Sequence, residues 1–375
     1  MSAKEVPMVT AGGIDDVRLV RKAITGWAIS VRSTQASKHV DKPRFVSYDR
    51  IRLPSGEILG RKKVILMTGG CSVPTCTMCP FTNENDYGHK DHHHDLVTQV
   101  RDALVRTGEE PDYELLSLYN DGSFFATNEI PENVQIEIAR LVGQAGVRRL
   151  VVESLPQFIT IDRLRPFVQE LGDVALEVGI GFQSSNELIR EVLVNTRVSR
   201  RQFQSALQVL QDVGAEPKIY LMIKPPFVSE EEALTDVIQS VAYIKERGIH
   251  GVTLCPTRVS KNTVAWELYK GGDYAPPNLW TVLEAVKLAN RDAEVRVACI
   301  NLRGSDFESV FPDSCPNCAD AIVDGLLDFS ETGDTGALDI HCDCRPPLVS
   351  VPLDDNVLLG RAVATLKKHQ RLSSP

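Results

Sequence analysis

The stretch that decides the fold lies between Lys62 and Phe81 and reads KKVILMTGGCSVPTCTMCPF. Its apolar run, Val64–Met67, has the length and composition of a short buried strand. Two glycines and a loop with three cysteines follow this run directly. In folds built from βα units, the loops after the strands carry the chemistry, so this loop is a candidate site.

The chain continues with short apolar runs that alternate with longer amphipathic stretches from residue 63 to about 255, which indicates βα units and a parallel sheet. Glycines stand just past the ends of the predicted helices. The predicted strands are Val64–Met67, Leu115–Tyr119, Arg149–Glu153, Ala175–Phe182, Lys218–Ile223 and Gly251–Cys255. The predicted helices between them are Asp95–Arg106, Glu132–Ala145, Ile161–Leu171, Ser199–Val213 and Glu230–Arg247. Six units are fewer than the eight of a closed barrel, so we expect an α/β fold with a partial (βα)6 barrel.

Both flanks are expected to be extensions packed on this core, because no Gly/Ser-rich or Pro-rich linker separates them. The N-terminal flank contains a predicted helix at Asp15–Ile29 and then a basic, irregular stretch, Arg44–Lys63. That stretch suits a solvated strand edge better than a polynucleotide surface. The C-terminal flank contains a predicted helix at Leu279–Ala289 and more cysteines. The expected division is 1–62 for the N-terminal extension, 63–256 for the core and 257–375 for the C-terminal extension.

Composition places the chain among folded globular proteins. Of its 375 residues, 43% are hydrophobic and 24% are charged, which argues against disorder over most of the length. The net charge of −9 gives no bulk attraction to phosphates, so a nucleic-acid partner would need a local basic surface. The chain shows neither a signal peptide nor a run of about 18 apolar residues, and we expect a cytoplasmic protein. In that reducing compartment, clusters among its nine cysteines favour metal binding over disulfides.

The first cysteine group consists of Cys71, Cys76 and Cys79. Three thiolates on one tight loop can hold three irons of a [4Fe–4S] cluster and leave the fourth iron open to a ligand. A zinc site is the alternative, with His89 or one of the histidines at 92–94 as a distant fourth ligand. The spacing favours the cluster.

A C-x4-C-x2-C loop after the first strand of six βα units resembles a spacing variant of the signature of radical S-adenosylmethionine (SAM) enzymes. Five further stretches follow in an order that resembles the branch containing the elongator catalytic subunit and, more closely, the radical SAM subunit of archaeosine synthase. They are Asn120-Asp121-Gly122-Ser123-Phe124-Phe125, Val152-Glu153-Ser154-Leu155-Pro156, Gly181-Phe182-Gln183-Ser184, Ile223-Lys224-Pro225-Pro226-Phe227 and Tyr274-Ala275-Pro276-Pro277-Asn278-Leu279-Trp280. With both cysteine groups, the resemblance spans most of residues 63–350.

The resemblance implies two cofactors, the [4Fe–4S] cluster and SAM. The open iron would hold the amino and carboxylate groups of SAM, and an electron from the cluster would cleave SAM to a 5′-deoxyadenosyl radical. Gly122 would allow close backbone approach to the methionine end of SAM, and Ser123 would donate to its carboxylate. An ordinary turn at these two residues is the alternative.

Three more residues are predicted near SAM from the same resemblance. Glu153 would accept from the ribose hydroxyls or the methionine ammonium, Gln183 would lie beside SAM, and Lys224 would contact SAM or substrate. The alternatives are a salt bridge at the rim for Glu153, a structural turn amide for Gln183 and a surface lysine for Lys224. Phe81 would either shield the cluster or belong to the core.

The second cysteine group pairs a C-x2-C with a later C-x-C and consists of Cys315, Cys318, Cys342 and Cys344. Four thiolates suit either structural zinc or a fully ligated auxiliary iron–sulfur cluster. Both metals remain open at this stage, with a slight preference for iron–sulfur because the chain already has to meet the machinery that loads clusters.

Other candidates are weaker. The run Asp91–Asp95 contains three histidines but reads as a solvated loop in which Asp95 caps the next helix. Cys255 and Cys299 lie on apolar stretches and are expected to be core thiols.

The predicted function is that of a radical SAM enzyme, of lyase or transferase type, in tRNA modification. Its substrate would be a modified 7-deazaguanine with an amino-acid side chain in tRNA, whose C–N bond breaks after hydrogen abstraction. The partners would be SAM, a reductant such as flavodoxin or ferredoxin, and tRNA. A first alternative is the biosynthesis of a small nucleoside or natural product, with sulfur supplied by an auxiliary cluster. A second, from another class, is a zinc-binding nucleic-acid module without redox chemistry.

Overall fold

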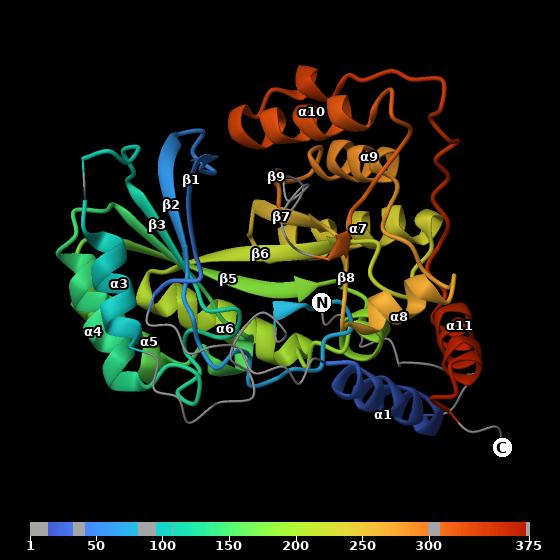
Figure 1. Ribbon diagram of the computed structural model, residues 1–375, viewed down its shortest axis with the longest axis horizontal. Coiled ribbons are helices and arrows are strands. Elements are labelled where there is room, and N and C mark those ends of the chain that lie inside the picture. Colours follow the sequence, from blue (N-terminus) through green and yellow to red (C-terminus); the bar gives the residue numbers. More distant parts are fainter. Residues whose placement is uncertain (1–13, 33–41, 82–94, 107, 299–307, 373–375) are drawn as a thin grey trace.

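The structure is a computed structural model that describes residues 14–32, 42–81, 95–106, 108–298 and 308–372. Its centre is one eight-stranded sheet in the order β1-β2-β3-β4-β5-β6-β7-β9. The β1–β2 pair is antiparallel and every later pair in this sheet is parallel. Figure 1 shows α3, α4, α5 and α6 beside the β3–β5 part of the sheet and α9 and α10 beside β7 and β9. The predicted α/β partial barrel is confirmed.

All six predicted strands are present. The strands of the large sheet are β1 (Phe45–Arg52), β2 (Ile58–Ile65), β3 (Leu115–Tyr119), β4 (Arg149–Glu153), β5 (Ala175–Gln183), β6 (Glu216–Ile223), β7 (Gly251–Pro256) and β9 (Glu294–Val297). A separate two-stranded ribbon joins β8 (Val259–Ser260) and β10 (Ser309–Val310). The largest difference is at β2, which begins at Ile58 because its whole length pairs with β1.

The predicted helices are also present, with ends shifted by at most two residues. The helices are α1 (Ile14–Ser30), α3 (Leu96–Leu104), α4 (Glu132–Gly143), α5 (Ile161–Leu171), α6 (Arg200–Val213), α7 (Glu230–Lys245), α8 (Val264–Lys270), α9 (Leu279–Ala289), α10 (Ala319–Thr332) and α11 (Asp355–Lys368). Short turns of helix are η1 (Pro156–Phe158), the π-helix η2 (Leu188–Leu193) and η3 (Thr335–Leu338). Side chains of Ser199 and Ser229 form capping boxes at the starts of α6 and α7, and Asp95 caps α3 as predicted. None of the helices within the described residues has the length and apolarity that a membrane span needs.

The basic stretch Arg44–Lys63 is not irregular, and this prediction was wrong. It forms most of the β1–β2 hairpin, in which Arg61 and Lys63 both pair with Asp49, at 2.6 and 2.9 Å. Lys62 is only 3% exposed. Because charged residues here point to internal partners, the alternation of apolar and polar residues that marks a strand is hidden in the sequence.

Both flanks add strands to the central sheet. The N-terminal flank contributes β1 and the first part of β2, and the C-terminal flank contributes β9, which pairs with β7. The expected boundary at residue 62 therefore falls inside β2. The division into a core and two extensions stays a prediction, and the sheet continues across both of its boundaries.

The two faces of the sheet differ in chemistry. Alternate strand residues such as Leu118 and Val152 belong to one large apolar core together with residues of the surrounding helices. The other face, which we call the inner face, carries polar and charged side chains beside a small apolar cluster. It includes Arg61, Tyr119, Glu153, Lys218 and Arg296. The inner face, next to the cysteine loop, is therefore the polar part of the barrel.

Candidate active site and metal centre

The first cysteine group lies on the loop that follows β2, and its three thiols are half-buried. Burial raises the pKa of Cys71, and the nearby charges of Glu129, Cys76 and Cys79 raise it further. Burial and then Cys79 raise the pKa of Cys76 to about 12. Thiols that oppose each other's ionisation lie close together, and a bound metal is what would favour their thiolate forms. All three residues predicted for the cluster lie on one loop, near enough to affect one another's ionisation, and their role as ligands stays a prediction.

Threonines between these cysteines anchor the loop to the end of η2. The Thr77 hydroxyl donates to the Leu193 carbonyl at 2.9 Å, and the Thr75 hydroxyl donates to the Asn195 carbonyl at 2.9 Å. The Asn195 amide returns a hydrogen bond to the Thr75 carbonyl at 3.0 Å. Asn195 has a left-handed backbone, with φ of 61°, so the segment after η2 is shaped to meet the loop.

A buried carboxylate fastens the start of the cysteine loop to the turn after β3. Glu129 accepts from the backbone and the hydroxyl of Ser72, both at 2.7 Å, and from the Asn120 amide at 3.3 Å. It also accepts from the backbone N–H of Ser123. Burial raises the pKa of Glu129, while these hydrogen bonds oppose the rise. No motif marks Glu129 in the sequence, because it lies in a turn.

Gly122 and Ser123 lie against the same carboxylate. A Cβ at Gly122 would clash with Glu129 Oε2 and would lie 3.2 Å from Cys71 Cα. The Ser123 hydroxyl accepts from the backbone N–H of Leu155 at 3.1 Å. Glycine is therefore required for the close packing of the β3 turn on the cysteine loop. The roles of both residues toward SAM stay predictions.

Glu153 ends β4 on the inner face and is hydrogen bonded to the hydroxyl of Tyr220. Burial raises its pKa, whereas Tyr220 and Lys218 act in the opposite direction. A Cβ at Gly179, between the two strands, would lie 3.0 Å from Glu153 Cγ and 2.8 Å from Tyr220 Cε2. The Tyr220 hydroxyl thus holds the Glu153 carboxylate inside the barrel, at the end of β4 nearest the cysteine loop.

Gln183 and Lys224 both follow their strands with left-handed backbones, with φ of 68° and 55°. Gln183 ends β5 after an irregularity in its pairing with β6. Lys224 is 7% exposed, donates to Glu230 at 2.7 Å, and its carbonyl accepts from the Tyr274 hydroxyl at 2.6 Å. The surface-lysine interpretation is therefore wrong. Strained backbone often gathers at functional sites, but contacts of these residues with SAM stay predictions.

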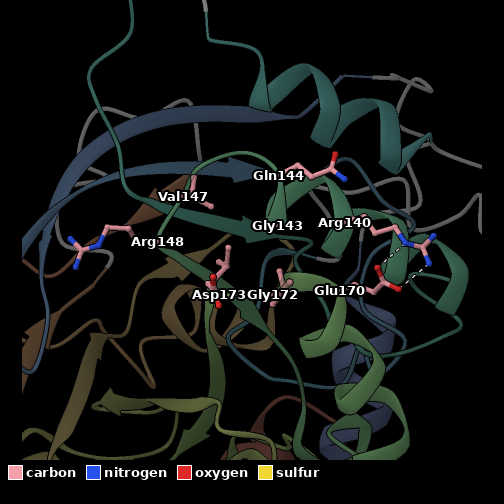
Figure 2. A pocket seen from close by; sticks show the side chains of 10 residues that line it. Arg140, Gly143, Gln144, Val147, Arg148, Glu170, Gly172 and Asp173 are labelled. Carbon is pink, nitrogen blue, oxygen red and sulfur yellow. Dashed lines mark hydrogen bonds and ion pairs between the residues drawn. The ribbon is translucent and has the colours of Figure 1, made fainter.

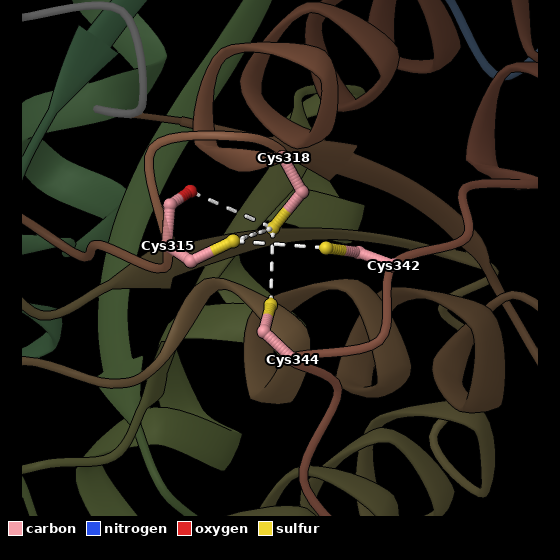
Figure 3. A group of neighbouring side chains, drawn as sticks. All are labelled: Cys315, Cys318, Cys342 and Cys344. Carbon is pink, nitrogen blue, oxygen red and sulfur yellow. Dashed lines mark hydrogen bonds between the residues drawn. The ribbon is translucent and has the colours of Figure 1, made fainter.

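The second cysteine group forms a compact set of four thiols between the start of α10 and the chain after η3 (Figure 3). The Sγ atoms of Cys315 and Cys318 lie 3.5 Å apart, those of Cys315 and Cys342 3.6 Å, and those of Cys318 and Cys344 3.5 Å. All four ligand atoms lie within 4.8 Å of one another. Zn–S bonds of 2.3 Å in a tetrahedron place sulfurs about 3.8 Å apart. The separations fit one ion and leave little room for a cluster of four irons.

An indole hydrogen bond reaches this centre from α9. The Nε1–H of Trp280 donates to Cys344 Sγ at 3.3 Å. This donor, followed by the neighbouring thiols, lowers the pKa of Cys344 to about 6. A thiol that is readily ionised and oriented by a second layer of side chains is typical of a metal ligand.

A shallow depression lies at the other edge of the sheet (Figure 2). Its lining comes from the ends of α4 and α5 and the starts of β4 and β5. One side carries the ion pair between Arg140 and Glu170, at 2.9 Å. It contains no cysteine, and the parallel strands lead away from it toward the cysteine loop. It is therefore not part of the candidate site.

The remaining candidates divide into two groups. Cys299, His89 and the histidines at 92–94 lie outside the described residues. Cys255 is on β7, half-buried on the inner face, where it influences the ionisation of Tyr220. The prediction of an apolar core thiol was wrong for Cys255. Phe81 is half-buried, with the Arg258 guanidinium 5.8 Å from its ring centre, so neither interpretation of Phe81 is decided.

Curated proteins are similar to this chain over much of its length. An uncharacterized protein of Methanocaldococcus jannaschii is 27% identical over 292 residues, which cover 75% of this chain and 79% of that protein. Archaeosine synthase subunit beta of Methanosarcina acetivorans is 25% identical over 288 residues, which cover 75% of this chain and 82% of that protein. The subunit of the same name from Thermococcus kodakarensis is 24% identical over 197 residues, 52% of this chain and 60% of that protein.

Solved structures are similar at lower identity. The archaeal Elp3 of Methanocaldococcus infernus is 18% identical with a TM-score of 0.45, over 61% of this chain and 58% of that one. Methylornithine synthase is 10% identical with a TM-score of 0.48, over 78% of this chain and 74% of that one. No protein-family profile matches the chain. The ordered motifs, the partial barrel with its three-cysteine loop, and the similarity to archaeosine synthase subunit beta support the resemblance to radical SAM enzymes.

Proposed function

We propose that this radical SAM enzyme cleaves a C–N bond in a modified 7-deazaguanine of tRNA, as the resemblance to archaeosine synthase implies. The observation that carries the proposal is the similarity to archaeosine synthase subunit beta over 82% of that protein. A flavodoxin or ferredoxin remains the expected reductant.

In this proposal, Cys71, Cys76 and Cys79 hold the [4Fe–4S] cluster. When bound, the cluster and SAM supply reductive cleavage of a sulfonium bond and hence hydrogen abstraction. The contribution of the chain is to orient these groups. Thr77 and Glu129 fix the cysteine loop from opposite ends, on η2 and on the β3 turn. An anchored loop keeps the three sulfurs at one spacing, which the open fourth iron requires.

The predicted SAM contacts surround this loop. Gly122 and Ser123 pack beside Cys71, while Glu153, Gln183 and Lys224 stand at the carboxyl ends of β4, β5 and β6. Carboxyl ends of adjacent parallel strands share one edge of the sheet, so these side chains converge on one side of the barrel. We infer that SAM lies between this edge and the cysteine loop, with Glu153 facing the barrel interior.

The test is anaerobic reconstitution followed by incubation with SAM and dithionite. The parent protein is expected to release 5′-deoxyadenosine, and Cys76→Ala should lose most of its iron from this site and the product. Lys245→Ala is the control, because Lys245 is exposed on α7 and pairs with Asp292 rather than with the loop. Product formation by Cys76→Ala at the parent rate would contradict the cluster assignment.

A small nucleoside or natural product is the second candidate substrate, favoured by the net charge of −9. The two substrates are separated by offering tRNA that carries the modified 7-deazaguanine and the corresponding free nucleoside. Conversion of only the free nucleoside would support the second candidate. Sulfur donation is disfavoured in either case, because the second cysteine group has the spacing of a single ion.

A further inference from the structure

The inner face of the barrel contains charged side chains that lie near one another without forming hydrogen bonds. Lys218 on β6, Glu177 on β5 and Arg296 on β9 have side chains that are 4%, 4% and 9% exposed. Glu177 Oε1 is 4.0 Å from Lys218 Nζ and 4.0 Å from Arg296 Nη1. Neither Oε1 nor Nη1 has a hydrogen-bond partner among the described residues. The three charged groups therefore form loose ion pairs and keep hydrogen-bonding capacity that the described residues do not use.

Two neighbouring hydroxyls show the same deficit. Ser117 Oγ on β3 and Thr253 Oγ1 on β7 are buried and have no hydrogen-bond partner within the described part of the chain. Both residues occupy inner-face positions, as Lys218 and Arg296 do. A buried polar atom without a partner costs about 1–3 kcal/mol, so such atoms normally meet water or a ligand. Unpaired buried atoms on four strands of the inner face indicate that this face can accept a polar group.

The charge around these groups is positive overall. Other inner-face cations have carboxylates nearby: Arg61 and Lys63 share Asp49, and Arg149 pairs with Glu216. Glu177 is the carboxylate near both Lys218 and Arg296. Its Oε2 also lies 3.5 Å from Arg149 Nη1. Burial lowers the pKa of Lys218 to about 8, although Glu177 acts to raise it. An added anion would relieve this imbalance.

An acceptor for a cation stands beside these donors. The strand register places Glu153, Gly179 and Lys218 side by side across β4, β5 and β6. A Cβ at Gly179 would lie 2.8 Å from Tyr220 Cε2 and 3.0 Å from Glu153 Cγ, so the missing side chain makes room for the Tyr220 ring beside this carboxylate. Glu153 and Tyr220 are half-buried, so this level of the barrel is open to solvent. A negative and a positive group across a glycine are complementary to the two charges of an amino acid.

We infer that the inner face binds an α-amino-acid group, with Lys218 and Arg296 holding its carboxylate and Glu153 receiving its ammonium instead of making the SAM contact that the resemblance implies for it. This inference rests on the proposed function, in which the group is the amino-acid side chain of the substrate. Glu177 is a positioning residue that holds the two cations apart from other partners and competes with the incoming carboxylate. The site is distinct from the methionine part of SAM, which would lie at the cysteine loop.

Binding is tested on reconstituted, SAM-loaded protein by anaerobic calorimetry with three probes. L-norleucine carries both charges, hexanoate lacks the ammonium and L-norleucinamide lacks the carboxylate. The parent should bind norleucine at millimolar concentrations and each of the other two about tenfold more weakly, since each lacks one charge-assisted hydrogen bond. Equal binding of norleucine and its amide would overturn the inference.

Variants give the sharper test because two of them should act in opposite directions. Lys218→Met should weaken norleucine about tenfold, whereas Glu177→Gln should tighten it, since the amide no longer competes for the cations. Lys245→Gln, which removes an exposed cation that pairs with Asp292 on the outside, should leave affinity unchanged. If both buried variants weaken binding by the same factor, the two residues serve only the fold and the inference fails. Absence of 5′-deoxyadenosine from the parent would instead refute the proposed function.

Discussion

Replacing Cys318 by serine tests which metal the second cysteine group holds. Three of the sulfur–sulfur separations are 3.5–3.6 Å, and a regular tetrahedron with such edges would have its centre about 2.2 Å from each corner, close to the Zn–S distance of about 2.3 Å. Zinc in small zinc-binding peptides contributes about 10–16 kcal/mol to folding. Here the metal would join α10 to the chain after η3, so losing one of four thiolates should cost at least about 3 kcal/mol. At about 2 °C for each kcal/mol, the midpoint of thermal unfolding should fall by about 6 °C.

Metal analysis and thermal unfolding on the same preparations give the measurement. The parent should contain one zinc for each chain, together with about four irons from the first cysteine group. Cys318→Ser should lose the zinc and keep the iron. Cys255→Ser is the control, because this thiol lies outside both groups and its loss should leave the zinc count unchanged. A parent with about eight irons for each chain and no zinc would refute the reasoning from sulfur spacing.

Three further predictions concern the cysteine loop and the core. Glu129→Gln removes a negative charge beside Cys71, so the midpoint potential of the reconstituted cluster should rise in an EPR titration, and an unchanged potential would contradict the contact. Gly122→Val should displace Glu129 and weaken SAM binding in calorimetry, while Gly26→Ala, which meets nothing within 4 Å, serves as the control. Burial raises the pKa of Asp236 to about 7, so its contribution to stability is full below about pH 4 and is lost as pH rises through 7. The unfolding free energy of Asp236→Asn should therefore fall less between pH 5 and 8 than that of the parent. An equal fall in the parent and the variant would contradict the raised pKa of Asp236.

Elements with a clear repeat of apolar residues could be predicted from the sequence, and elements without such a repeat could not. The helices Ile161–Leu171 and Leu279–Ala289 were predicted to the residue, because their apolar faces and end signals are local. Strand β9 has only four residues and includes buried Arg296, so no alternation was visible. The π-helix η2 was missed because its extra residue per turn leaves no mark on composition.

The candidate site divides in the same way. The cysteines could be found because three of them lie within nine positions of the chain. Glu129 accepts a hydrogen bond from Ser72, which is 57 residues away in the sequence. The Leu193 carbonyl accepts one from Thr77, which is 116 residues away. Only the folded chain brings such partners together. The choice between zinc and iron–sulfur likewise required distances between sulfurs, since both metals accept the same four residues.

The tail beyond the second cysteine group leads back to the first. After Cys344 the chain meets α7, where Thr235 donates to the Val351 carbonyl at 2.6 Å. It then forms α11, whose Arg361 holds Glu232 of α7 at 2.6 and 2.9 Å. At the start of α11, Asp355 accepts from Asn186, just before η2, at 2.8 Å.

The end of η2 supplies the carbonyl groups that hold the cysteine loop. A metal in the second group would therefore fix the start of a segment whose other contacts brace the support of the first group. We expect the second metal to affect the first group by positioning α11 and not by electron transfer, because a single zinc ion has no redox chemistry. Metal binding by the second cysteine group should therefore help to position the loop that carries the first cysteine group.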